Sequence, residues 1–163
     1  MVRYFILLTI ALSACVVNSV TPIIAQPITN PPAVAREVTF KQVGSDIYLL
    51  FEFTSSNAVV LVTDEGVLVV DTRQHPRDGQ DLIDRIRKIT DKPIKWVINS
   101  HFHGDHHFGN SAFKAIGATI VAQKDTARIM QRVQQKELAR RGNFFKSRGY
   151  DPSEVKLVLP DVT

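Results

Sequence analysis

The chain has 163 residues, of which 44% are hydrophobic and 22% are charged, and its formal net charge is +4. These values are typical of one globular domain and exclude a disordered or fibrous chain. Because the sequence has no block of like charges and no alternation of basic and aromatic residues, nucleic acid is not an expected partner.

The first 25 residues (1–25) are typical of an export signal rather than of a folded domain. Arg3 precedes an apolar run from Tyr4 to Ala14, which is the pattern of a secretory signal. Two cleavage sites stay open with equal weight. The residues Leu12-Ser13-Ala14-Cys15 resemble the lipobox of bacterial lipoproteins, whose cysteine carries the lipid, whereas Ala25 fits the end of an ordinary signal peptide.

We therefore expect an exported bacterial protein that is either periplasmic or attached to the membrane through lipid on Cys15. An uncleaved anchor over residues 4–25 is the least favoured alternative, because Asn18, Ser19 and Pro22 interrupt the roughly 20 apolar residues that a span requires. If Cys15 is removed with the signal, the mature protein has no cysteine and forms no disulfide.

Residues 26–35 contain three prolines without apolar periodicity, which predicts an extended linker before a domain over 36–163. Four short segments rich in Val, Ile, Leu and Phe then predict β-strands. They are VTFKQV (38–43), DIYLLFEF (46–53), NAVVLVT (57–63) and VLVVDT (67–72). Between the last two strands we expect a hairpin turn that ends at Gly66, a residue free to adopt a positive φ.

From residue 78 onward, the spacing of the apolar residues changes from that of strands to that of helices. We expect an amphipathic helix over 78–90, a strand over 94–99 that is buried on both faces, a helix over 110–117, a strand over 118–122 and a helix over 124–140. Strands followed by alternating helices and strands predict a mixed sheet with helices on its outer face. We interpret the basic residues of 124–148 as a solvated helix surface rather than a site for an anionic partner or membrane.

The ten residues HFHGDHHFGN (101–110) hold four of the five histidines of the chain. They follow the predicted strand 94–99, at the end where open sheets of this kind bind ligands. In extended backbone, His101 and His103 project to the same side and could reach one cation. Asp105 and His106 emerge beyond the bend and are aimed at a second point close by.

The spacing therefore predicts two metal ions on one turn. Nitrogen and oxygen donors without thiolate suit zinc first, and manganese or iron less well.

The segment His101-Phe102-His103-Gly104-Asp105-His106 matches the H-x-H-x-D-H signature of the metallo-β-lactamase fold superfamily. The strands before it and the helix after Asp71 resemble the N-terminal half of that family, and the resemblance covers residues 36–163. It implies an α+β fold, the αββα sandwich of the family, with only the N-terminal half present in this chain.

The resemblance also implies a mechanism and a site. His101 and His103 would hold the first zinc, and Asp105 and His106 the second. A dizinc-bound hydroxide would then attack an ester, lactone, lactam or similar bond of a small-molecule substrate. Asp105 would in addition orient the attacking water and carry its proton, and Asp71 would brace the ligands from beneath the site.

The sequence departs from the family in its C-terminal half. The family places a third ligand for each metal there, and no histidine follows His107 in this chain. We therefore expect an incomplete site, either in a fragment of a longer hydrolase or in a truncated product. The alternative function is a non-catalytic exported module that binds metal weakly or pairs with another chain, and the oligomeric state stays open.

Four aromatic residues near the motif have simpler interpretations. His107 matches no ligand position, and a role in a loop or at a helix start is favoured for it. His75 is interpreted as a solvated loop histidine in preference to one that lines the pocket. Phe102 and Phe108 are expected to pack rather than to contact substrate.

Overall fold

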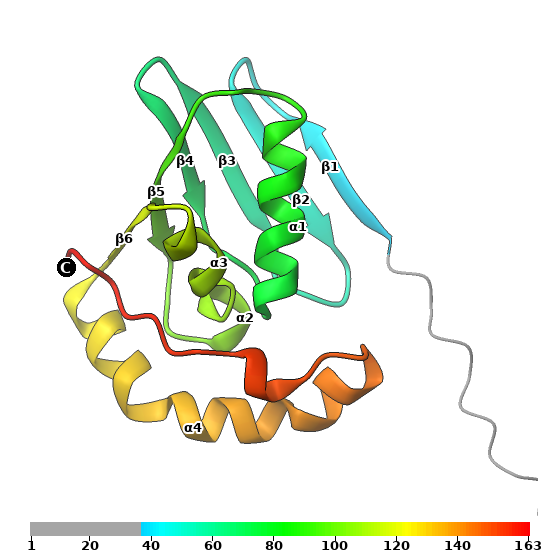
Figure 1. Cartoon of the computed structure of the whole chain (residues 1–163), viewed down its shortest axis with the longest axis vertical. Coiled ribbons are helices and arrows are strands. Elements are labelled where there is room, and N and C mark those ends of the chain that lie inside the picture. Colours follow the sequence, from blue (N-terminus) through cyan, green and yellow to red (C-terminus); the bar gives the residue numbers. More distant parts are fainter. Residues whose placement is uncertain (1–36) are drawn as a thin grey trace, which may run out of the picture. The chain divides into compact units, whose positions relative to one another are not determined.

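The computed structural model describes residues 37–163, which form a six-stranded mixed β-sheet with helices on one face (Figure 1). The predicted export signal, Cys15 and the linker lie outside these residues, so those expectations stay predictions. Within 37–163 no helix is both long and apolar enough to cross a membrane.

The strands lie in the sheet in chain order. Their bounds are β1 Val38–Gln42, β2 Ile47–Glu52, β3 Ala58–Thr63, β4 Gly66–Val70, β5 Ile94–Asn99 and β6 Thr119–Ala122. The first four form an antiparallel meander, and β4, β5 and β6 run parallel. The predicted strands and the mixed sheet are confirmed. Gly66 begins β4 at φ 145, where an added Cβ would lie 2.8 Å from the carbonyl oxygen of Pro93.

The helices are α1 Pro76–Arg87, α2 Gly104–His107, α3 Asn110–Ala115 and α4 Lys124–Ser147, followed by the 3-10 helix η1 Pro152–Glu154. Helix α1 begins two residues before the predicted start, because Pro76 occupies the first turn and the His75 side chain accepts a hydrogen bond from the backbone N–H of Arg77. Helix α4 extends seven residues beyond the predicted end at residue 140.

The interpretation of His75 as a solvated loop histidine is wrong. Its side chain is fully buried, and its ring stacks on Tyr150 with the centroids 4.3 Å apart. Its Nε2 lies 3.1 Å from the carbonyl oxygen of Asp151. These contacts come from a segment more than 70 residues away along the chain, and no local pattern around His75 could indicate them.

One face of the sheet carries the hydrophobic core, which α1 and α3 cover (Figure 1). The sheet contributes Leu50, Ala58, Val60, Val67, Val69, Val97 and Ile120, and the helices contribute Leu82, Ile83, Ile86 and Phe113. Side chains of successive strand residues alternate between the faces. The opposite face is therefore lined by Val59, Leu61, Leu68, Trp96 and Ile98, all of which are only partly buried.

The prediction that the strand 94–99 is buried on both faces is thus wrong for the part of the chain that the structure describes. Val97 is fully buried, whereas Trp96 and Ile98 are intermediate. An apolar strand face of this kind is normally covered by another layer of structure. Residues 37–163 supply a covering layer for one face of the sheet.

Candidate metal centre

The candidate site lies where β4 and β5 end, because Asp71 follows β4 and the histidine turn follows β5. Figure 1 shows both strands pointing toward the short helix α2, with α4 crossing beyond it. The two connections are joined by backbone hydrogen bonds from Thr72 N to His106 O (2.8 Å) and from Gly109 N to Arg73 O (3.1 Å). At Gly109 an added Cβ would lie 1.9 Å from the carbonyl oxygen of Thr72, so this approach requires glycine.

His101 and His103 face one another, as the sequence predicts. Their nitrogens Nε2 and Nδ1 lie 3.1 Å apart, and their ring centroids 4.8 Å apart. Two nitrogens that bind one tetrahedral zinc at about 2.1 Å are separated by about 3.4 Å. This first pair therefore has nearly the spacing that one zinc ion requires.

Asp105 and His106 form a second pair of donors. Oδ2 of Asp105 lies 3.5 Å from Nε2 of His106, which again matches the separation of two ligands on one zinc. The rings of His101 and His106 have centroids 4.0 Å apart, so the two pairs are neighbours. The residues present thus fit two adjacent cations.

Asp71 orients the histidines from beneath. Its Oδ2 accepts a hydrogen bond from Nδ1 of His106 (2.8 Å) and another from the Ser100 hydroxyl (2.7 Å), while its Oδ1 accepts from the Ser100 backbone N–H (2.8 Å). Since His106 donates through Nδ1, its Nε2 keeps the lone pair that a metal requires. These hydrogen bonds suit a bracing role for Asp71, which stays a prediction.

Ser100 extends this arrangement to His101. Because the Ser100 hydroxyl donates to Asp71, it accepts from Nδ1 of His101 at 3.0 Å, which leaves Nε2 of His101 unprotonated. Sequence reasoning missed Ser100, since a serine beside a histidine has no distinctive pattern.

The backbone at this connection adopts conformations that are unusual for side-chain-bearing residues. Asp71 has φ 65 and Arg73 has φ 72, both in the left-handed region. Such conformations cost free energy, and they persist where surrounding contacts fix them. The contacts of Asp71 with Ser100 and His106 are contacts of this kind.

The pKa of His101 favours a neutral imidazole. Burial lowers the pKa of His101, and the neighbouring His106 and His103 lower it further. A neutral ring is the form that binds metal, so little proton competition is expected near pH 7.

His107 has a different role from the other motif histidines. It is buried as the last residue of α2, and its Nε2 donates to the carbonyl oxygen of Phe102 at 3.1 Å. Burial lowers its pKa to about 4. His107 thus packs and hydrogen-bonds within the fold, but it ends α2, and the expected position in a loop or at a helix start is wrong.

Asp105 is held from two sides. The Ser56 hydroxyl donates to its backbone carbonyl, and Nη2 of Arg141 in α4 donates to its Oδ1 at 2.5 Å. The interpretation of the basic residues of 124–148 as solvated is therefore wrong for Arg141. It is also wrong for Arg148, whose guanidinium pairs with the buried Glu52.

Among residues 37–163, no three His, Cys, Asp or Glu side chains converge on one point. Each donor pair thus supplies two ligands, and a tetrahedral zinc has four positions.

Comparison with known proteins identifies the family. The family model described as the metallo-beta-lactamase superfamily matches residues 52–159. The chain is 29% identical over 101 residues to a metallo-beta-lactamase type 2 of Elizabethkingia meningoseptica, a match that covers 58% of this chain and 41% of that protein. It is 43% identical over 49 residues to a linear primary-alkylsulfatase of Pseudomonas sp. (strain ATCC 19151), which covers 30% of this chain and 9% of that protein.

Solved structures show the same fold. A metallo-beta-lactamase from Hirschia baltica gives a TM-score of 0.56 at 17% identity, covering 77% of this chain and 51% of that one. The enzyme FIM-1 from Pseudomonas aeruginosa, in its mono-zinc form, gives 0.54 at 21% identity, covering 58% and 46%. The chain spans about half the length of these structures. It belongs to the metallo-β-lactamase superfamily, and its mixed sheet and helices are part of that fold.

Proposed function

We propose that this chain is the N-terminal half of an exported hydrolase in which His101, His103, Asp105 and His106 hold two zinc ions. The observation that supports this most is the spacing of the two donor pairs, 3.1 Å and 3.5 Å, each close to that of two ligands on one zinc. The mono-zinc form of the similar FIM-1 structure supports zinc at the level of the family.

The proposed reaction is hydrolysis of an ester, lactone, lactam or similar bond in a small molecule. The names of the curated relatives, a β-lactamase and an alkylsulfatase, support this class of reaction. Bound zinc would supply Lewis acidity, lowering the pKa of a water and stabilising negative charge on the substrate.

The residues of the chain would act by presenting donors and moving a proton. Asp71 holds Nδ1 of His106 directly and Nδ1 of His101 through Ser100, so both rings present an unprotonated Nε2. In our proposal Asp105, besides holding zinc, also orients the attacking water and accepts its proton.

The alternative proposal is a non-catalytic exported module that binds metal weakly. The observation that favours it is that each donor pair within residues 37–163 supplies two ligands. Export itself, and attachment through Cys15, remain part of the proposal.

Zinc titration of the chain tests the assignment. We expect His103→Ala to lose the first ion and Asp105→Asn to weaken the second. Asp64→Asn is the matched control, because Asp64 is exposed on the β3–β4 turn. A well-folded protein that binds no zinc, alone or completed by the proposed C-terminal half, would contradict the assignment.

A further inference from the structure

Asp105 is paired with a cation that comes from a distant part of the chain. Arg141 lies 36 residues further on, and its Nη2 donates to Oδ1 of Asp105 at 2.5 Å. The side chains of Arg141 and Asp105 are only 19% and 25% exposed. Water therefore screens the pair less than it would screen a pair on the surface.

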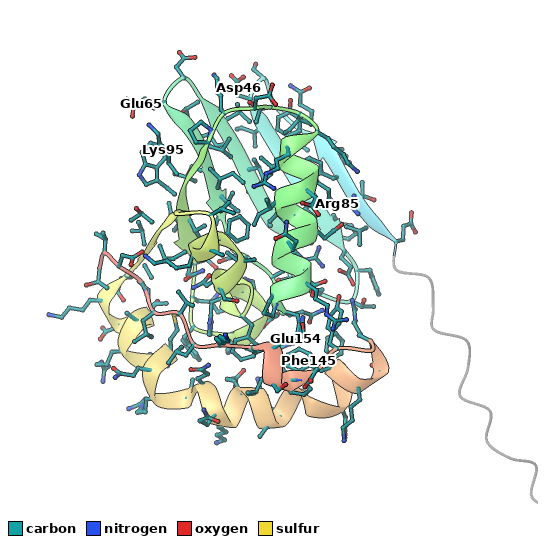
Figure 2. The ribbon with its side chains drawn as sticks, in the orientation of Figure 1. Asp46, Glu65, Arg85, Lys95, Phe145 and Glu154 are labelled. Atoms are coloured by element: carbon teal, nitrogen blue, oxygen red, sulfur yellow. The ribbon has the colours of Figure 1, made fainter. Side chains whose placement is uncertain are left out.

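Helix α4 fixes Arg141 in this position. Phe145 follows one turn later on the same face of the helix, and Arg148 is the residue that caps its C-terminal end. Phe145 is fully buried, and its ring packs near that of Phe108 with the centroids 6.4 Å apart. Figure 2 shows Phe145 on the side of α4 that faces the rest of the domain.

Ion pairs hold the C-terminal end of α4 against the sheet. Arg148 forms an ion pair with Glu52, which also pairs with Arg73. Glu52 is 2% exposed, and the Arg73 side chain is fully buried. Because both contacts of α4 are buried, the guanidinium of Arg141 is a fixed part of the site.

The two oxygens of Asp105 have different neighbours. Oδ1 is bound by Arg141, whereas Oδ2 lies 3.5 Å from Nε2 of His106. A divalent cation held by Oδ2 and His106 would therefore be separated from the guanidinium by one carboxyl group.

We propose that Arg141 makes the two metal positions unequal, so that the position of Asp105 and His106 binds zinc more weakly than it would without the arginine. This inference rests on the proposed function. Arg141 neutralises part of the negative charge of Asp105 and places a positive charge beside the incoming cation. The donors of the other position are His101 and His103, and neither is a carboxylate paired with Arg141.

An opposing effect is that Arg141 holds Asp105 in the orientation suited to metal binding. That benefit is limited to the rotamer entropy of one short side chain. The repulsion between a fixed positive charge and a divalent ion is twice that between two single charges at the same distance, and the partly buried setting preserves it. Repulsion should therefore dominate.

The test is a zinc titration of the chain completed by a separately expressed C-terminal half, followed by NMR signals of the histidine side chains. His101 and His103 report the first position and His106 reports the second. We expect Arg141→Gln, which removes the charge but can still donate a hydrogen bond, to tighten the second position by about tenfold or more. Arg141→Lys, which keeps the charge, should leave it close to wild type.

Two controls accompany these variants. Arg140→Gln removes the same charge one residue away, from a side chain that is 62% exposed, and should change neither position. Asp105→Asn combined with Arg141→Gln should remove the gain, since the arginine acts through this carboxylate. Circular dichroism of each variant checks that the fold is retained.

The outcomes separate the two proposals. If zinc binds His101 and His103 normally but Arg141→Gln leaves the second position unchanged or weaker, Arg141 only orients Asp105 and this inference is wrong. If zinc binds neither pair in any variant, the proposed metal centre itself is wrong, and this inference falls with it.

Discussion

Replacement of Asp71 by asparagine should weaken both the fold and the metal centre. The substitution keeps the size of the side chain and removes its charge. It also suits the backbone, since Asp71 has φ 65 and asparagine adopts the left-handed region readily. Any loss can therefore be assigned to the hydrogen bonds and not to backbone strain.

The magnitude follows from the partners of the carboxylate. Asp71 accepts three hydrogen bonds, two from Ser100 and one from His106, and it is 6% exposed. Asparagine has one acceptor oxygen, so one or two of these bonds are lost. At about 1.5–3 kcal/mol for each bond to a charged group, we expect the free energy of unfolding to fall by about 2–4 kcal/mol.

The effect on metal binding arises from the tautomer of His106. An amide N–H₂ in the place of Oδ2 would donate to Nδ1 and move the ring proton to Nε2, the nitrogen proposed to bind zinc. With the amide reversed, the N–H₂ would instead face the backbone N–H of Ser100. Loss of such a supporting contact typically lowers metal affinity about 10–100-fold.

Two assays measure these effects. Urea unfolding followed through Trp96, the one tryptophan of the chain, gives the stability, and competition with a chromophoric chelator gives the zinc affinity. Asp64→Asn on the exposed β3–β4 turn serves as the control. If Asp71→Asn unfolds at the same urea concentration and binds zinc equally well, the bracing role is refuted.

Three further predictions concern the fold and its processing. Gly109→Ala should destabilise the chain by several kcal/mol in urea unfolding, because the new Cβ would overlap the Thr72 carbonyl at 1.9 Å, whereas Gly142→Ala in α4 meets no atom within 4 Å and should not destabilise it. His107 has a pKa of about 4 in the fold against about 6.5 in the unfolded chain, so the unfolded chain takes up a proton first as the pH falls. The free energy of unfolding should therefore be highest above pH 6.5 and should fall by about 3 kcal/mol as the pH is lowered toward 4. In His107→Gln, the free energy of unfolding should depend less on pH over that range. Cys15→Ser should abolish incorporation of labelled fatty acid, and absence of label in the wild type would favour the cut at Ala25 instead.

Much of the fold could be predicted from the sequence because its signals are local. Short apolar segments indicated the six strands, and the 3.6-residue period of Leu82, Ile83 and Ile86 indicated α1. The spacing of the histidines brought the candidate ligands together, since residues two to five apart cannot separate far in space.

The remainder depends on contacts between distant residues. Arg141 reaches Asp105 across 36 residues, and Ser56 reaches the same residue across 49. A basic residue on an amphipathic helix has the same local pattern whether it pairs with a buried carboxylate or is solvated. Periodicity therefore placed α4 but could not show which of its arginines contact the site.

One face of the sheet is apolar and only partly buried, and it carries Leu61, Leu68 and Trp96. We expect residues 26–163 alone to aggregate, dimerise or remain partly molten, because a partly exposed apolar face of this kind favours association. With two ligands for each zinc, the chain alone should also hold metal weakly. Addition of a separately expressed C-terminal half should then restore zinc binding and hydrolysis together.

The most direct test of the account is elemental analysis of the protein completed in this way. We predict close to two zinc ions per chain, about one after His103→Ala, and hydrolysis that a chelator abolishes. Absence of zinc from the well-folded, completed protein would contradict the metal centre. Hydrolysis of an ester or lactam by the 163-residue chain alone, abolished by a chelator and by His101→Ala, would contradict the claim that the site is divided between two halves.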